Sequence, residues 1–179
     1  LHQPPAEIPA DRAGAENENP HGRSFRRWMP EAKLAIDGRE SNRVSAAERP
    51  VGLRDSIPVG ATLSMRAGSA AQVLLAWEEP DRLHRGLQGA AFTATALSGV
   101  RRRGWAQSVG EREPGVASVS APVRSPSGRV IAAVSISGPI ERLSRQPGRL
   151  HAATVIAGAN KLTEVLARHA AQQDVQNNA

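Results

Sequence analysis

The sequence contains no cysteine, which excludes a disulfide framework and any metal site built on thiolates. Aromatic residues make up only 3% of the chain, so a hydrophobic core has to be built from Val, Ile, Leu and Ala. No apolar run approaches the length needed to cross a bilayer, and the first residues lack the apolar stretch of a signal peptide. These absences fit a cytoplasmic protein with no membrane partner.

The charge of the chain is unevenly distributed. The net charge of +6 falls entirely on residues 51–179, and nearly all of the basic side chains are arginines. A basic balance raises the prospect of contact with nucleic acid. Here the arginines are scattered and no aromatic residues lie between them, which favours an ordinary arginine-rich surface.

Composition divides the 179 residues into one domain and two tails. Residues 1–30 are polar and punctuated by prolines, so we expect a poorly ordered tail. Residues 31–169 carry the regular apolar patterns of a domain, and residues 170–179 are expected to fray. The first strands of the domain are expected at 34–36, 43–47 and 51–54.

Four segments predict helices. Residues 67–78 carry apolar side chains at i, i+3, i+4 and i+7, and residues 80–87 open with a proline, which suits a first helical turn. A short helix follows Pro139, and a long one spans about 148–169. The long helix is expected to place Leu150, Ile156, Leu162 and Leu166 on one side.

A further helix is predicted to end at Arg103. Thr95 is suited to cap its start, and Gly104 is suited to end it. Its last turn would hold three consecutive arginines, where positive charge stabilises the helix dipole. That role is favoured over a DNA-binding patch.

The most informative stretch runs from Trp105 to Pro139 and predicts a β-hairpin. If residues 125–128 form the turn, Arg124 pairs with Arg129. This register places Ser118 opposite Ser135, Val116 opposite Ser137, and Ser120 opposite Ala133. Residues two apart in a strand share a face. Four serines therefore lie on one face: Ser118, Ser120, Ser135 and Ser137. A core face holds Val130, Ala132, Val134 and Ile136.

A sheet face with four small hydroxyl residues indicates a binding pocket or an exposed hairpin edge. Buried hydroxyls need partners, and small side chains leave room for a ligand. A one-residue slip of the register would separate the serines. Two predicted helix starts, at Gly68-Ser69-Ala70 and at Ser137-Gly138-Pro139, offer free N–H groups and positive potential. If both open toward the serines, the site suits a small anionic or zwitterionic metabolite.

Enzyme chemistry has weaker support in the sequence. None of the five histidines has metal-ligand spacing with another histidine or a carboxylate. A serine hydrolase needs a histidine and an acid beside one serine, whereas His84 and His151 fit helix surfaces better. The chain also lacks a phosphate-binding glycine pattern. We therefore expect neither an enzyme nor a cofactor. The element order, with an antiparallel hairpin and a terminal helix, predicts an α+β fold.

Residues 51–167 resemble the effector-binding domain of the IclR (isocitrate lyase regulator) family of bacterial transcription regulators. The segments that carry the resemblance are 65–76, 103–106, 115–123 and 132–139. The last of these, Ala-Ala-Val-Ser-Ile-Ser-Gly-Pro, is fairly specific at its distance after the Gly-Val-x-x-x-x-Ala-Pro-Val strand. The loop Gly110–Gly115 is similar to the actinobacterial branch that regulates leucine and other amino-acid biosynthesis.

The resemblance implies a GAF-like fold, in which a curved antiparallel sheet is flanked by helices and holds a small effector in a cup. It also implies dimers or tetramers, and an operator bound through a helix-turn-helix domain that these 179 residues do not contain. The family's effector contacts fall on Ser69, Ala70, Ser108, Ser118, Ser135 and Ser137.

The sequence departs from the family pattern in two segments of this site. Ser69-Ala70-Ala71-Gln72 stands where well-known members have a Gly-Ala-Gly-Lys-like helix start, and Ser108 stands where many have an acidic residue. Residues 1–30 do not match the family at all. The leading hypothesis is thus a sensing and oligomerising domain whose effector cannot be transferred from relatives. A small serine hydrolase and a ligand-free interaction module are the alternatives.

Overall fold

The computed structural model describes residues 40–42 and 60–177. The chain divides into a unit of residues 1–33 and a unit of residues 34–179, and all of the described residues belong to the second. The predicted tail at 1–30 and the strands expected at 34–36, 43–47 and 51–54 lie outside the described residues.

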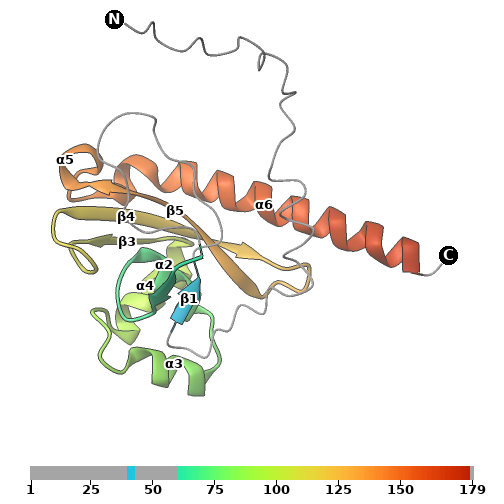
Figure 1. The fold of residues 1–179 in the computed structure, drawn as a ribbon, viewed down its shortest axis with the longest axis horizontal. Coiled ribbons are helices and arrows are strands. Elements are labelled where there is room, and N and C mark those ends of the chain that lie inside the picture. The colour runs from blue at the N-terminus through green and yellow to red at the C-terminus, as the bar shows by residue number, and fades with distance from the viewer. Residues whose placement is uncertain (1–39, 43–59, 178–179) are drawn as a thin grey trace, which may run out of the picture. The chain divides into compact units, whose positions relative to one another are not determined.

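Three antiparallel strands form the main sheet, in the order β3 (Ala106–Val109), β4 (Val116–Arg124) and β5 (Val130–Pro139) (Figure 1). A separate antiparallel pair joins β1 (Glu40–Asn42) to β2 (Thr62–Ser64). The sequence pattern missed this pair, because three-residue strands show too little alternation to be detected. The architecture is α+β with an antiparallel sheet, as predicted.

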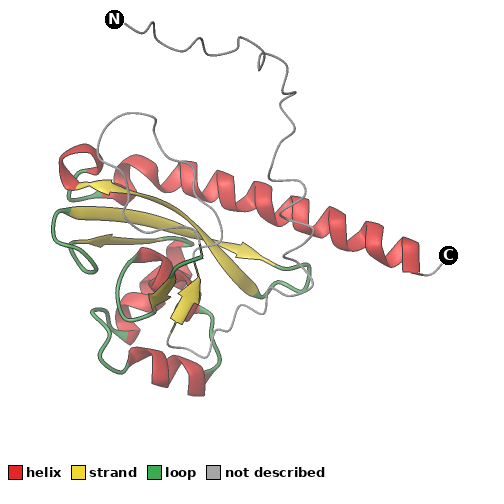
Figure 2. Cartoon of the chain, in the orientation of Figure 1, coloured by secondary structure: helices red, strands yellow, loops and turns green. Residues whose placement is uncertain are grey.

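The helices lie on both faces of the main sheet (Figures 1 and 2). On one face are α2 (Ser69–Ala76), α3 (Pro80–Leu87) and α4 (Ala94–Arg103), and on the other is the long α6 (Pro147–Asn177). The short α5 (Ile140–Leu143) connects β5 to α6. Seven of the eight residues of α2 are buried, because this helix lies between the sheet and the two helices outside it.

Alternation along β4 separates the two faces of the sheet. Val119, Ala121 and Val123 are fully buried against α6. Ser118 and Ser120, which alternate with them, point to α2. The buried stripe of α6 is Val155, Ala159 and Leu166. The predicted stripe was wrong in two members, since Leu150 is 60% exposed and Leu162 is 38% exposed. At about 100° a residue, Leu150 lies nearly opposite the buried stripe, whereas Leu162 lies only about 40° from its centre.

The predicted hairpin forms, but its register differs by two residues from the expected one. Ser118 pairs with Ser137 and Ser120 pairs with Ser135, rather than with Ser135 and Ala133. A bulge between Val123 and Arg124 adds a residue to β5, and the turn closes from Ser125 to Arg129. Because the difference is even, the serines stay on one face.

The bulge also divides the predicted core face of β5. Ala132, Val134 and Ile136 pack toward α6, as expected, and Ile131 joins them. Val130 instead packs with the cluster on the α2 side of the sheet. An extra residue in one strand shifts the side chains beyond it to the opposite face of the sheet.

The predicted boundaries of α4 need one correction. Thr93, not Thr95, caps the helix, because its Oγ1 accepts a hydrogen bond from the N–H of Ala96 at 3.2 Å. Gly104 ends the helix as predicted, in a left-handed conformation with φ of 80°. The two threonines fit the same capping pattern, and only the backbone path decides between them.

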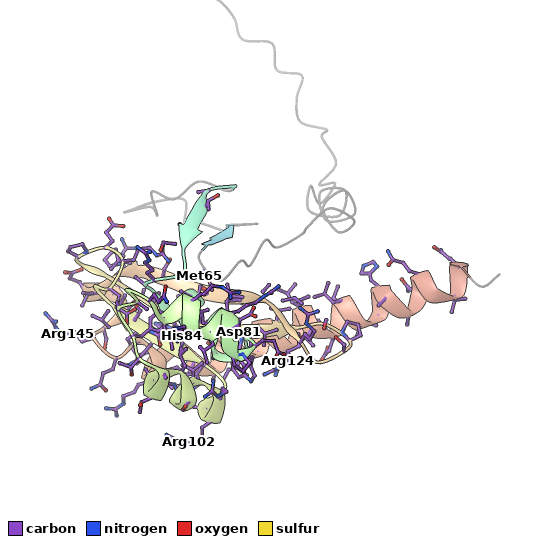
Figure 3. The ribbon with its side chains drawn as sticks, turned by 90° about the horizontal axis from the view of Figure 1, so that it is seen from below. Met65, Asp81, His84, Arg102, Arg124 and Arg145 are labelled. Atoms are coloured by element: carbon purple, nitrogen blue, oxygen red, sulfur yellow. The ribbon has the colours of Figure 1, made fainter. Side chains whose placement is uncertain are left out.

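The three arginines at the end of α4 serve the fold. Arg101 donates from Nη1 to the carbonyl of Ala76 at 2.6 Å, at the end of α2. Arg103 donates to the carbonyl of Trp105 and lies 4.7 Å from the centre of its ring. Partial burial, with a smaller contribution from the charge of Arg102, lowers the pKa of Arg103. Arg102 is exposed and lies at the periphery of the helical layer (Figure 3).

Helix α6 is longer than the predicted 148–169. It continues to Asn177, because residues 170–177 contain neither proline nor glycine. Neither α6 nor any other helix in the described ranges is long and apolar enough to span a membrane.

Candidate functional site

All of the buried polar side chains in the described part of the chain gather where the start of α2 meets the sheet. They are Ser69, Gln72, Ser108 and Ser120, with exposed fractions of 1%, 4%, 5% and 0%. Burying a hydroxyl or an amide costs free energy unless hydrogen bonds replace those to water. A polar cluster inside a core of small aliphatic residues therefore marks a candidate site.

The sheet contributes two rows of small residues to this cluster. Ser108, Ser118 and Ser137 lie side by side across β3, β4 and β5, and the neighbouring row holds Ala106, Ser120 and Ser135. Ser135 and Ser137 on β5 are exposed, whereas Ser108 is nearly buried. The cluster is thus open on the β5 side.

A chain of hydroxyl groups joins the sheet to α2. Ser69 donates to Ser118 at 2.7 Å, and hydrogen bonds of 2.7 Å join Ser69 to Ser120 and Ser120 to Ser135. Each serine has one hydroxyl proton, and that of Ser69 is used on Ser118. Ser120 must therefore donate to Ser69, and Ser135 must donate to Ser120. The chain ends at Ser118, whose own proton remains available to a further acceptor.

Ser108 offers a second available hydroxyl. Its side chain is 5% exposed, yet within the described residues it has no hydrogen-bond partner. It lies beside Ser118 in the register of β3 and β4. A hydroxyl in such a position requires an acceptor or a donor from water or a ligand. Two adjacent O–H groups favour a ligand with acceptor oxygens.

The start of α2 adds backbone donors to the site. Gly68 precedes the helix with φ of 95°, a conformation that glycine adopts without strain and that turns the chain into the helix beside Ser69. The first N–H groups of a helix, here those of Ser69 and Ala70, have no acceptor within the helix. Ala70 is half-buried on the same turn.

One of the expected donors at this helix start already has an acceptor. Glu111, in the loop between β3 and β4, accepts a hydrogen bond from the N–H of Gly68 to Oε2 at 2.9 Å. The amide of Gln72 donates to Oε1 of Glu111 at 3.1 Å and to the carbonyl of Gln107 at 3.2 Å. The anion position at this helix start is therefore filled by a side chain of the protein itself.

The second predicted helix start does not contribute in the same way. Helix α5 is a single turn, and the N–H of Ile140 donates to the carbonyl of Gly115 at 2.8 Å. The expectation that both helix starts offer free N–H groups to the serines is thus wrong for α5.

The structure brings most of the predicted site residues together. Ser69, Ser118 and Ser135 belong to one hydroxyl chain, Ser108 and Ser137 flank Ser118, and Ala70 follows Ser69. Site prediction from the sequence missed Ser120, Gln72 and Glu111. Ser120 could have been included from its place on the serine face. Nothing local to Gln72 or Glu111 indicates their contact, because it joins residues 39 positions apart.

The histidines lie away from the serines, which removes the geometry of a serine hydrolase. His84 is exposed on α3 (Figure 3), and His151 lies on α6, behind the opposite face of the sheet. No hydrogen bond joins either histidine to a serine within the described residues. In the same part of the chain, no group of three or more His, Cys, Asp or Glu side chains could hold a metal ion.

A hollow of about 240 Å³ lies elsewhere, on the α6 side of the sheet. Its lining includes Arg103, Pro122, Asn160 and Thr163, and none of the predicted site residues. We base the candidate site on the buried polar cluster instead, because unmatched hydrogen-bonding groups define specificity better than an open hollow.

An antiparallel sheet with a polar cluster under one helix start defines a small-molecule sensing domain rather than a catalytic centre. The family model described as "Bacterial transcriptional regulator IclR C-terminal" matches residues 33–164. The chain belongs to this family of transcription regulators. Members of the family regulate transcription and are not enzymes, which agrees with the prediction from the sequence.

Curated relatives support the same assignment. The chain is 30% identical over 115 residues to the HTH-type transcriptional regulator XynR of Escherichia coli, covering 57% of this chain and 46% of XynR. It is 29% identical over 133 residues to the HTH-type regulator BhcR of Paracoccus denitrificans, covering 67% of this chain and 48% of BhcR. The chain therefore spans about half the length of the curated relatives it matches.

Solved structures share the fold. A transcriptional regulator from Rhodococcus sp. RHA1 is 28% identical, with a TM-score of 0.66 over 74% of this chain and 59% of that one. The inducer-binding domain of PobR from Acinetobacter, solved with 3-hydroxybenzoic acid, is 21% identical, with a TM-score of 0.60 over 72% of this chain and 83% of that one. The predicted α+β effector-domain fold is confirmed.

Proposed function

We propose that the serine cluster binds a small carboxylate or amino-acid metabolite. The observation that carries the proposal is the pair of hydroxyls of Ser108 and Ser118, which lie side by side within the buried polar cluster and have protons available to a ligand. The proposed contacts are Ser69, Ala70, Ser108, Ser118, Ser135 and Ser137, with Ser120 holding the hydroxyl chain in place.

The charge and polarity of the cluster support an acceptor-rich ligand. Ser108 and Ser118 offer O–H donors, and the first turn of α2 offers N–H donors and the positive end of the helix dipole. Buried aliphatic residues surround the closed side of the cluster, so these donors act in surroundings less polar than bulk water. A carboxylate oxygen satisfies such donors better than a neutral acceptor does.

The intact regulator would convert this binding into a change of operator affinity. A ligand with different affinities for two arrangements of the protein shifts the balance between them. The curated relatives are HTH-type regulators, which supports a helix-turn-helix domain as the operator-binding part. We further propose that the sensing domain begins at about residue 31 after a tail at 1–30, forms dimers or tetramers, and works in the cytoplasm.

The loop Gly110–Gly115 supports placing the chain in the branch that regulates leucine and other amino-acid biosynthesis. Amino acids therefore belong among the first compounds to test. The carboxylate of such a ligand would meet the donors of the serine cluster and of the first turn of α2.

A thermal-shift screen of amino acids and small organic acids tests the proposal. A ligand that binds the folded state raises the melting temperature, and the shift grows with ligand concentration. Replacing the exposed Ser135 with Phe should abolish the shift and leave the fold intact. Ser127→Phe, in the exposed hairpin turn, is the matched control and should retain the shift.

Two results would count against the proposed function. A shift that survives Ser135→Phe would place the ligand at another face of the protein. The absence of a shift with every compound in the panel would favour an interaction module with a collapsed cup.

A further inference from the structure

Glu111 holds the start of α2 in the way that a ligand carboxylate would hold it. Its Oε2 accepts from the N–H of Gly68 at 2.9 Å, and its Oε1 accepts from the amide of Gln72 at 3.1 Å. Glu111 forms no ion pair in the described part of the chain, and Gln72 is neutral. Its negative charge is compensated by backbone and amide donors, by the positive end of the helix and by the guanidinium of Arg112, which lies close to Gly68.

A second carboxylate at this helix start would meet the first one. Two negative charges within a few ångströms repel each other strongly where water is excluded, so they cannot share these donors. Beside this position, the residue Ser108 is 5% exposed and its hydroxyl has no hydrogen-bond partner within the described residues, so it is available to a ligand. The carboxylate position formed by the N–H of Gly68 and the amide of Gln72 is therefore already occupied by Glu111.

We propose that Glu111 is an internal competitor for the effector, so that a carboxylate ligand binds at the start of α2 only by displacing it. This inference rests on the proposed function and specifies which carboxylate ligands the site would select. A ligand that offers only a carboxylate exchanges one set of hydrogen bonds for an equivalent set and gains little. A ligand with a second polar group that reaches Ser108 or Ser118 gains hydrogen bonds that Glu111 cannot make.

The selected class is therefore small carboxylates that carry a second hydrogen-bonding group, such as hydroxy acids, oxo acids and amino acids. Simple monocarboxylates are rejected, although they fit the anion position. Competition of this kind lowers the affinity for every carboxylate ligand by the same factor. Only ligands that form additional hydrogen bonds then bind appreciably.

Displacement of Glu111 does not require the loop to open. Arg112, the next residue, donates to the carbonyl of Ser64 at 2.9 Å and to that of Ala67 at 2.6 Å. These bonds hold the loop against the segment before α2 without help from Glu111. Rotation of one side chain toward the solvent is therefore sufficient to clear the position.

Acetate is a suitable probe, because it offers a carboxylate and nothing else. Titration of acetate into the isotope-labelled 179-residue chain, followed by the amide NMR signals of Gly68, Ser69 and Ala70, measures binding at the start of α2. We expect Glu111→Ala to bind acetate at least about tenfold more tightly than the unmodified chain, the change expected when one charge-assisted competing hydrogen bond is removed.

Glu113→Ala is the matched control. Glu113 belongs to the same loop and carries the same charge, but its side chain is exposed and forms no hydrogen bond with α2 in the part of the chain that the structure describes. It should bind acetate as weakly as the unmodified chain. Acetamide, which has the shape of acetate without its charge, should show little difference between the chains.

Glu111→Gln keeps the size of the side chain and one acceptor oxygen, so it can replace Glu111→Ala in the titration if the alanine variant unfolds. It should give a smaller gain in acetate affinity of the same sign. Equal affinities in all of the chains, or no change in the α2 signals of a folded Glu111 variant up to molar acetate, would overturn the inference. Either result leaves the proposed function standing if a screened ligand is still blocked by Ser135→Phe. The proposed function fails separately if acetate behaves as expected but no ligand depends on Ser135.

Discussion

The indole ring of Trp105 occupies the space beside Gly148 that any side chain at that position would need. The N–H of Gly148 also donates to Oε1 of Gln107 at 2.9 Å. Both contacts join the beginning of α6 to the strand that carries Ser108. The carbonyl of Gln107 accepts from Gln72 on the opposite side. Gln107 therefore links α6 to the start of α2 through the sheet.

The contact with Trp105 predicts that Gly148→Ala destabilises the domain. A Cβ at this position would overlap the indole ring, and overpacking of this kind costs about 1–3 kcal/mol in the free energy of unfolding. Urea denaturation measures the effect. Gly158→Ala in the same helix is the control, because its Cβ would meet Val134 at 3.7 Å, an ordinary contact. It should be neutral or stabilising by up to about 1 kcal/mol, as alanine favours helix. Equal effects of the two changes would contradict the contact.

The capping of α4 predicts different effects for two neighbouring threonines. Thr93→Ala removes the acceptor for the N–H of Ala96 and should lower the free energy of unfolding by about 1 kcal/mol. Thr95→Ala changes an exposed residue inside the first turn and should be neutral or slightly stabilising. Thermal or chemical unfolding of both variants distinguishes them, and a larger loss for Thr95 would show that the helix begins later.

The hydroxyl chain predicts that Ser120→Ala destabilises the site. Ser120 is fully buried and bonded to Ser69 and Ser135, so the change leaves both neighbours without one partner. We expect a loss of about 1–2 kcal/mol in urea denaturation and weaker binding of any ligand found in the screen. Ser125→Ala, which removes an exposed hydroxyl pair with Ser127 in the turn, should change neither quantity. Indistinguishable stabilities of the two variants would mean that the chain of serines contributes nothing.

The open edge of β4 predicts a role for Thr163 of α6. Strand β3 pairs with residues 117–120 only, so the last residues of β4 have no strand neighbour on that side within the described ranges. The N–H of Arg124 donates to Oγ1 of Thr163 at 3.0 Å, and this hydroxyl in turn donates to the carbonyl of Ala159. Thr163→Val keeps the shape and removes the acceptor, so it should cost about 1–2 kcal/mol, whereas Thr163→Ser should cost less. Amide hydrogen exchange at Arg124 should become faster in the valine variant, and unchanged protection there would refute the role.

Much of the local structure could be predicted from the sequence. The bounds of α3, the end of α4 at Gly104 and the short α5 after Pro139 depend on proline, glycine and short apolar patterns. These signals act over a few residues and are visible without the fold. The boundaries failed where two residues offer the same chemistry, as with Thr93 and Thr95, or where no breaker stops the helix, as after residue 169.

The serine face shows which part of a strand arrangement the sequence determines. Alternation assigns Ser118, Ser120, Ser135 and Ser137 to one face, and an error of two residues in register leaves that assignment unchanged. The sequence could not predict which serines are neighbours, because the bulge between Val123 and Arg124 depends on how the strands twist against α6.

By itself, the sequence determined the α+β class, the family and the face of the hairpin that holds the serines, because these depend on composition, period and short motifs. Only the tertiary structure decided that Glu111 would fill the anion position at Gly68, that Ser69 would direct the hydroxyl chain toward Ser118, and that Ser108 would be left without a partner. These contacts join segments more than 40 residues apart, and their distances and directions arise only when the helix and the sheet pack together.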